Sequence, residues 1–164
     1  MIRQARTADA SRIAEILVFS KRTNYRSIFH NDAYSFGELQ VCSLAQTYLE
    51  DSCLLARTWV YTDAATDAYT KEDVELVKGL IEVQDAEIKT LYVDPFFTGE
   101  GIGQQLIRFA KENLGAERLW VLEKNPRAIK FYERNGFCAT GERVAEDGTP
   151  EFLVEMRVTD SSRS

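Results

Sequence analysis

A glycine-rich segment at residues 99–103 constrains the fold of this chain more than any other feature. It carries Gly99, Gly101 and Gly103 at alternate positions, between an apolar run over 87–93 and an amphipathic run over 101–114. Glycine lets a backbone turn tightly and expose its N–H groups, and the start of a helix adds unpaired donors and the positive end of its dipole. The segment therefore predicts a strand, a tight loop and a helix that form a site for a phosphate or pyrophosphate.

The spacing of the glycines disfavours two common nucleotide-binding loops. Gln104 stands where a G-x-G-x-x-G fingerprint counted from Gly99 needs its third glycine, and no Gly-Lys-Ser/Thr follows as in a P-loop. Taken alone, the loop is compatible either with phosphate binding or with a turn before an ordinary core helix.

Hydrophobic periodicity predicts a mixed order of elements. Helices are expected over 101–114 and 126–135, after a cap at Thr7 or Asp9, and once or twice within 25–50. The first helix should bury Ile13, Ile16, Leu17 and Phe19. Residues 62–73 lack an apolar period, so we expect a loop there. Strands are expected over 2–5, 54–61, 74–83, 87–93, 119–123, 137–144 and 152–158.

Bulk properties predict one soluble, cytoplasmic domain. The chain has 164 residues, which suits a single domain over 1–158 with a frayed tail over 159–164. Its 26 acidic and 20 basic residues leave a net charge of −6, which argues against a nucleic-acid partner. Neither a signal-like apolar region after Met1 nor a run near the roughly 18 apolar residues of a membrane span is present.

Cysteine and histidine are too few for most metal and nucleophile sites. Cys42, Cys53 and Cys138 have no metal-like spacing, and we expect three reduced, partly buried thiols. His30 is the only histidine, so we expect no metal site and favour a surface position over a catalytic role for this residue.

A second motif follows the glycine loop by about twenty residues. The run L-W-V-L-E-K-N-P-R-A-I-K-F-Y-E-R-N-G-F at 119–137 predicts a strand, a turn with Asn125, and a helix that begins at Pro126 and ends before Gly136. The glycine loop with its lead-in L-Y-V-D-P at 91–95, followed by this motif in the same order, resembles the GNAT N-acetyltransferase superfamily.

The resemblance implies an α/β three-layer fold, with a mixed, mostly antiparallel sheet of six to seven strands flanked by helices. It also implies that acetyl-CoA is the co-substrate. Thr98 and Glu100 depart from the family, which favours Gln or Arg and a basic residue at these positions. By resemblance, the cofactor-binding residues are Leu91, Tyr92, Val93, Thr98, Gly99, Glu100, Gly101, Ile102, Gly103, Gln104 and Asn125.

For catalysis, the resemblance places Tyr132 near the sulfur of the coenzyme, where a phenol can protonate the departing thiolate. Glu87 corresponds to the catalytic glutamate of histone-acetylating members and is the candidate base, with Glu123 as its competitor. The implied activity is direct acetyl transfer to a primary amine of a small molecule or peptide.

Two other classes of function stay open. One is a non-catalytic acyl-CoA-binding or sensing domain, and the other is an interaction domain whose site has decayed, which Thr98 and Glu100 favour. The resemblance also allows a homodimer. It fades over 25–73, and the acceptor would bind within 25–50. Of the aromatic residues Tyr25, Phe29, Tyr34 and Phe36, we expect at least half to be core.

Overall fold

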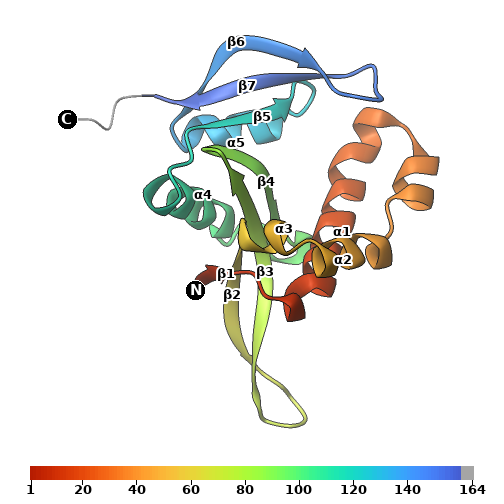
Figure 1. Ribbon diagram of the computed structural model, residues 1–164, viewed down its shortest axis with the longest axis vertical. Helices are drawn as coiled ribbons and strands as arrows, with labels where there is room; N and C mark the ends of the chain where they lie inside the picture. The colour runs from red at the N-terminus through yellow and green to blue at the C-terminus, as the bar shows by residue number, and fades with distance from the viewer. Residues whose placement is uncertain (160–164) are drawn as a thin grey trace.

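The computed structural model describes residues 1–159, which form a seven-stranded sheet with helices on both faces (Figure 1). The strands lie in the order β1-β2-β3-β4-β5-β7-β6, and among the described residues only β4 and β5 are parallel neighbours. The expected mixed, mostly antiparallel sheet is therefore confirmed. The strands are β1 (Ile2–Gln4), β2 (Thr58–Thr66), β3 (Asp73–Gln84), β4 (Glu87–Val93), β5 (Arg118–Leu122), β6 (Phe137–Ala145) and β7 (Phe152–Val158).

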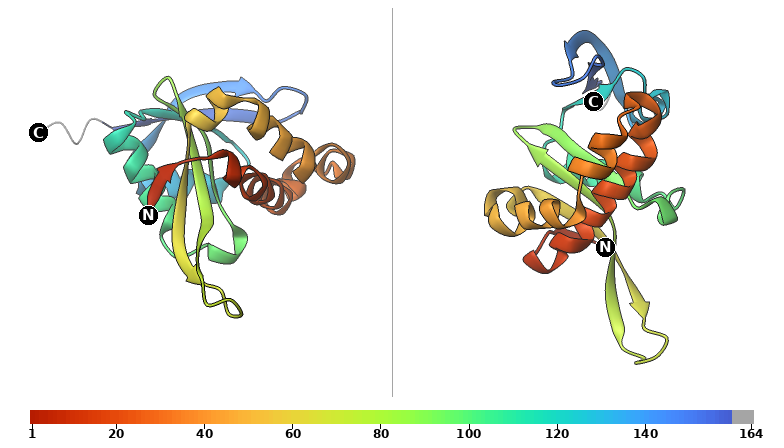
Figure 2. Two further views of the ribbon diagram at one scale, coloured as in Figure 1. Left: turned by 60° about the horizontal axis from the view of Figure 1, so that its bottom comes forward. Right: turned by 90° about the vertical axis from the view of Figure 1, so that its right-hand side faces the viewer.

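The helices divide the core into two layers. On one face α1, α2 and α3 pack through residues such as Leu17 and Tyr48, and on the other face α4 packs through residues such as Leu106. Figure 2 shows α1 and α4 on different sides of the sheet. The helices are α1 (Ala10–Phe29), α2 (Val41–Glu50), α3 (Ser52–Ala56), α4 (Ile102–Asn113) and α5 (Pro126–Arg134), with short turns η1 (Thr7–Asp9), η2 (Tyr34–Glu38) and η3 (Pro95–Phe97).

The parallel strands β4 and β5 separate soon after they start. They pair only at Glu87 with Arg118 and at Ile88 with Leu119, and then diverge (Figure 1). A register shift beside Glu82 marks the same region of the β3–β4 pair. Within the described residues, the second half of β4 therefore has an edge without a strand partner, and unpaired N–H and C=O groups can accept an extended ligand.

Two expected boundaries were wrong. The strand expected over 54–61 begins at Thr58, because Asp51 caps the short helix α3 by accepting a hydrogen bond from the N–H of Leu54 at 2.9 Å. The loop expected over 62–73 is confined to 67–72, since β2 runs to Thr66 and β3 starts at Asp73. These strand ends form an arm that projects from the body (Figure 1), so solvent on both faces removes the apolar period.

Several side chains that we expected to be buried are exposed to solvent. Phe19 is 48% exposed, because it lies off the apolar stripe of α1. The three cysteines are free, as expected, but all are exposed rather than partly buried. Of the four aromatics expected to be half core, none is fully buried, and Tyr34 and Phe36 are exposed. Tyr25 and Phe29 lie in the last turns of α1, where Tyr25 still contacts β4, whereas Tyr34 and Phe36 lie in the separate short turn η2.

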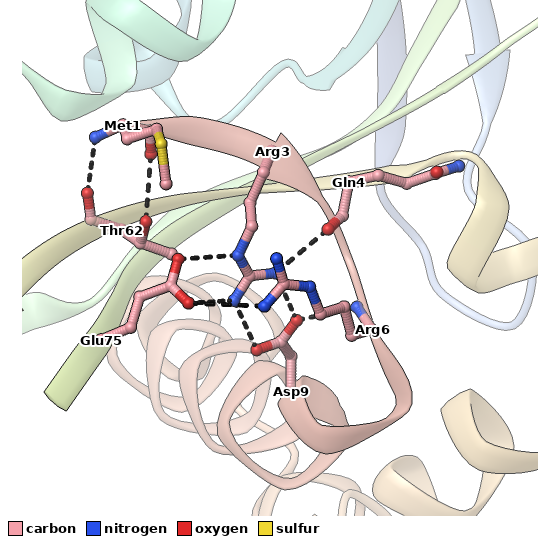
Figure 3. A network of polar contacts seen from close by, with 7 residues as sticks. All are labelled: Met1, Arg3, Gln4, Arg6, Asp9, Thr62 and Glu75. Atoms are coloured by element: carbon pink, nitrogen blue, oxygen red, sulfur yellow. Dashed lines mark hydrogen bonds and ion pairs between the residues drawn. The ribbon is translucent and has the colours of Figure 1, made fainter.

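An ion-pair network joins β1, η1 and β3 at the start of the chain (Figure 3). The Arg3 guanidinium lies 2.8 Å from Asp9 and 2.7 Å from Glu75. Hydrogen bonds from Arg3 lower the pKa of Glu75 to about 2. Burial opposes ionisation of Asp9, but hydrogen bonds from the Arg3 side chain and the Arg6 backbone leave the pKa of Asp9 below its usual value.

We expect this network to give the protein a marked loss of stability in acid. A carboxyl whose pKa is lower in the folded state stabilises the fold fully above its unfolded pKa of about 4.3, and that contribution disappears as the pH falls toward its folded pKa. Urea unfolding between pH 6 and pH 2 should therefore show a shallower loss for Glu75→Gln than for the wild type. Glu112→Gln, at an exposed position on α4, is the control; equal slopes for all three proteins would contradict the prediction.

Candidate active site

The loop after β4 is fixed to the sheet by Asp94. This buried carboxylate accepts a hydrogen bond from the N–H of Phe96 at 2.8 Å and contacts the Arg12 guanidinium of α1 at 2.6 Å. The backbone N–H of Asp94 also donates to the carbonyl of Lys78 on β3. The start of the glycine loop is therefore held between α1 and the sheet.

Gly101 and Gly103 have different structural roles in the loop. Gly101 has a left-handed φ of 77° and precedes α4 without a side-chain cap, and a Cβ there would meet no atom within 4 Å. No side chain caps the first N–H groups of α4, and no Cβ at Gly101 covers them, so they are available to an anion. At Gly103, a Cβ would lie 3.2 Å from Cζ of Phe131, so this glycine lets α4 pack closely on α5.

The structure accounts for the two residues that depart from the family pattern. The hydroxyl of Thr98 donates to the carbonyl of Pro95 at 3.0 Å, within the same turn. The carboxylate of Glu100 lies 3.4 Å from the Nζ of Lys78, which also contacts Asp63 at 3.0 Å. The negative charge of Glu100 is therefore partly balanced by a neighbouring cation.

The end of β4 presents different side chains to the two faces of the sheet. Leu91 and Val93 pack in the core beneath α4, whereas Tyr92 packs on the α1 side. The hydroxyl of Tyr92 shares a hydrogen bond of 2.5 Å with the hydroxyl of Tyr25 on α1. The edge expected to receive the cofactor is thus bordered by a tyrosine pair.

Tyr132 on α5 lies near Tyr25 and Tyr92, and we call these three residues the tyrosine group. Its ring stacks edge to face with Phe131 and Phe137, at centroid distances of 5.4 and 6.1 Å. Burial, and then the neighbouring Tyr25, raise the pKa of Tyr132 well above its usual value. This raised pKa keeps the phenol protonated. Its hydroxyl makes no hydrogen bond with any of residues 1–159, so the proton is free to be donated.

The two carboxylates expected to compete as the base are both held in ion pairs. Glu87 contacts Lys89 at 2.8 Å and Arg118 at 3.2 Å, and six strand residues, or about 20 Å, separate it from Val93. Glu123 contacts Arg143 at 2.7 Å in an exposed position. Neither is brought beside the tyrosine group by a contact in the described part of the chain.

Sequence reasoning missed Glu82, a buried carboxylate on β3. It lies opposite Thr90 of β4, whose hydroxyl donates to it at 3.3 Å, and it pairs with Arg57 at 2.7 Å. Thr90 and Tyr92 are two residues apart and therefore point to the same face of β4. Because Glu82 is paired with Thr90, its side chain also lies on the α1 side, near the tyrosine pair. The sequence did contain a signal for this residue, because a charged residue stands inside the apolar run 79–83. Burying a carboxylate is costly, so its presence in such a run indicates a functional role.

Asn125 forms the N-cap of α5. Its Oδ1 accepts a hydrogen bond from the N–H of Ala128 at 3.1 Å, and Pro126 occupies the first helical turn. Among residues 1–159, no acceptor contacts its Nδ2, which leaves that amide group available to a ligand.

A crevice of about 590 Å³ lies at the C-terminal end of α1, on the side where the acceptor was expected. The crevice is lined by Ser27, Ile28, Phe29, His30, Lys124, Pro150 and Glu151.

Within residues 1–159, no group of three or more potential ligand side chains is arranged to hold a metal ion. No helix in this part of the chain has both the length and the apolar character of a membrane span.

A family model and several known proteins are similar to this chain in sequence. The family model described as "Acetyltransferase (GNAT) domain" matches residues 55–139, which include both motifs. The peptidyl-lysine N-acetyltransferase YjaB of Salmonella typhimurium is 26% identical over 156 residues, which cover 94% of this chain and 95% of that protein.

Two solved structures share the fold. The solution structure of apo-form YjaB from Escherichia coli has a TM-score of 0.71 at 22% identity and covers 97% of each chain. The PaiA N-acetyltransferase from Thermoplasma acidophilum, crystallised in complex with coenzyme A, has a TM-score of 0.65 at 19% identity. That match covers 96% of this chain and 98% of the other.

Proposed function

This chain belongs to the GNAT acetyltransferase family and is an acetyl-CoA-dependent acyltransferase, and from this premise we propose that it acetylates a primary amine of a small molecule or peptide. The observation that carries the proposal is the open helix start at Gly101 beside the unpaired edge of β4. Together they offer an anion site and an extended hydrogen-bonding edge in continuous order along the chain.

The residues of this site fit acetyl-CoA. Backbone N–H groups from Gly99 to Gln104 would hold the pyrophosphate, because left-handed glycines and the start of α4 leave these donors open. The edge from Leu91 to Val93 would pair with the pantetheine arm, with the amide of Asn125 as a further donor. The PaiA structure, which contains coenzyme A, supports the same ligand class for this fold.

For the transfer, we propose Glu82 as the group that takes a proton from the amine through water. The neutral amine attacks the thioester carbonyl, a C–N bond forms and the C–S bond breaks. Tyr132 donates its proton toward the departing thiolate, and a β4 N–H stabilises the charge on the carbonyl oxygen. Glu87 stays a competing proposal for the base, at a disadvantage because Lys89 and Arg118 hold its carboxylate.

The acceptor would enter on the α1 side. The crevice at the end of α1 and the tyrosine pair lie on this side of the sheet, and the relative YjaB is named as acting on peptidyl-lysine. A lysine side chain is therefore one member of the amine class to test. A non-catalytic acyl-CoA-binding domain is the alternative, favoured by the ion pairs of Glu82 and Glu87.

We expect acetyl-CoA to raise the melting temperature by roughly 5–10 °C at about a hundredfold excess over its dissociation constant, where a specific ligand adds about 2.7 kcal/mol. Gly101→Asp should abolish most of this rise, because a carboxylate about 4 Å from a phosphate costs roughly 1–4 kcal/mol. Gly101→Asn is the matched control, since both residues tolerate a left-handed φ and differ by one charge. Free adenosine diphosphate controls for general nucleotide binding, and equal shifts for the two variants would contradict the placement of the phosphates.

Turnover separates the enzyme from the binding domain. Release of free thiol from acetyl-CoA should depend on added amine across a panel of small amines and lysine peptides. A protein that binds the coenzyme but shows no amine-dependent release across the panel would be the non-catalytic alternative.

A further inference from the structure

Lys21 breaks the apolar stripe of α1. It lies four residues after the buried Leu17 and four before Tyr25, at a helical position that faces the sheet. Its side chain is half-buried, and its Nζ makes no hydrogen bond or ion pair with any of residues 1–159. Since no buried side-chain nitrogen in this part of the chain lacks a partner, the Nζ must reach accessible space.

The other lysines provide a contrast. Each of the other six lysines, except the exposed Lys130 of α5, donates to an oxygen atom of the protein. These donors are Lys71, Lys78, Lys89, Lys111 and Lys124. Lys21 is therefore the half-buried lysine whose amine is not occupied by an acceptor within the described residues.

The turns of α1 around Lys21 pack on the C-terminal end of β4, where the acetyl group is proposed to bind. The hydroxyl of Ser20 is 3.4 Å from the carbonyl of Val93, and Tyr25 bonds Tyr92. Burial lowers the pKa of Lys21, while the carboxylates of Glu146 and Glu82 act in the opposite direction. The amine thus combines a larger neutral fraction with a place on a stretch of α1 that contacts the end of β4 through Ser20 and Tyr25.

We propose that Lys21 is an internal acetyl acceptor, which takes the acetyl group of acetyl-CoA bound to the same chain when no external amine is present. The inference rests on the proposed function. The lone pair of Nζ attacks the thioester carbonyl carbon, the C–N bond forms, and the C–S bond breaks. One amine proton passes through water to Glu82, and the departing thiolate receives a proton from Tyr132, so the products are N-acetyllysine and free coenzyme A.

The test is incubation of the purified protein with acetyl-CoA alone, followed by proteolysis and mass spectrometry. We expect Lys21 to be acetylated at least about tenfold faster than Lys130, at a first-order rate that does not change with protein concentration, as an intramolecular reaction requires. Lys21→Arg should remove the main acetylated site, and Lys130→Arg should not. Gly101→Asp should slow acetylation of Lys21 without affecting Lys130.

Each other result overturns the inference in a recognisable way. Equal rates at Lys21 and Lys130, or a Lys21 rate insensitive to Gly101→Asp, would mean unassisted chemical acetylation. Turnover of external amines with Lys21 unmodified would overturn the inference and leave the proposed function standing. Coenzyme binding with neither external turnover nor Lys21 acetylation would overturn both.

Discussion

Replacing Tyr132 with phenylalanine is expected to lower kcat by roughly 10²-fold or more, the range for loss of a general acid. The hydroxyl has no hydrogen-bond partner among the described residues, so its removal leaves no group unsatisfied and should change stability little. Coenzyme-dependent thermal shifts should also stay near those of the wild type. Because the pKa of Tyr132 is raised, the wild-type enzyme should retain this proton donor throughout the neutral range.

Tyr92→Phe is the matched control for this experiment. It also removes one phenolic hydroxyl from the tyrosine group, but this hydroxyl is bonded to Tyr25, so the change should lower stability by about 1 kcal/mol. Its effect on kcat should be smaller than that of Tyr132→Phe. Wild-type kcat in Tyr132→Phe would remove the phenol from the proposed mechanism, whatever the control shows.

The part of the fold around the glycine loop was predictable because local chemistry decides it. Left-handed glycines before α4 and Pro126 at the start of α5 are local signals, and both helices occur where expected. The strands β4 and β5 also match, because their apolar runs are bounded by turn residues. The matched family segment over 55–139 covers these elements.

The wrong start of β2 reflects a local cap, Asp51 of α3, whereas other errors come from contacts between distant segments. The arm of β2 and β3 pairs polar residues in solvent, so its strands carry no apolar signal. Glu82 approaches the tyrosine pair only because β3 pairs with β4 in one register, which no local pattern specifies. The unpaired state of Lys21 likewise depends on which side chains the fold places around it, although its position on an apolar stripe was visible in the sequence.

The identity of the base can be decided by a pair of isosteric changes. We expect Glu82→Gln to lower kcat/KM by roughly 10²-fold or more and to remove the acidic limb of its pH profile, because a glutamine cannot accept the proton. Glu87→Gln should change kcat/KM much less, since the Glu87 carboxylate is already held by Lys89 and Arg118.

Both changes break an ion pair, so each also controls for the structural cost of the other. Glu82→Gln leaves the Arg57 guanidinium with a neutral partner, and Glu87→Gln does the same to Lys89 and Arg118, so the two changes should lower stability by similar amounts. Urea unfolding measures that cost separately from the pH profile, which a purely structural role would not reshape. The reverse outcome, in which Glu87→Gln removes the acidic limb, would assign the base as in the histone-acetylating members and leave Glu82 as a partner of Arg57 alone.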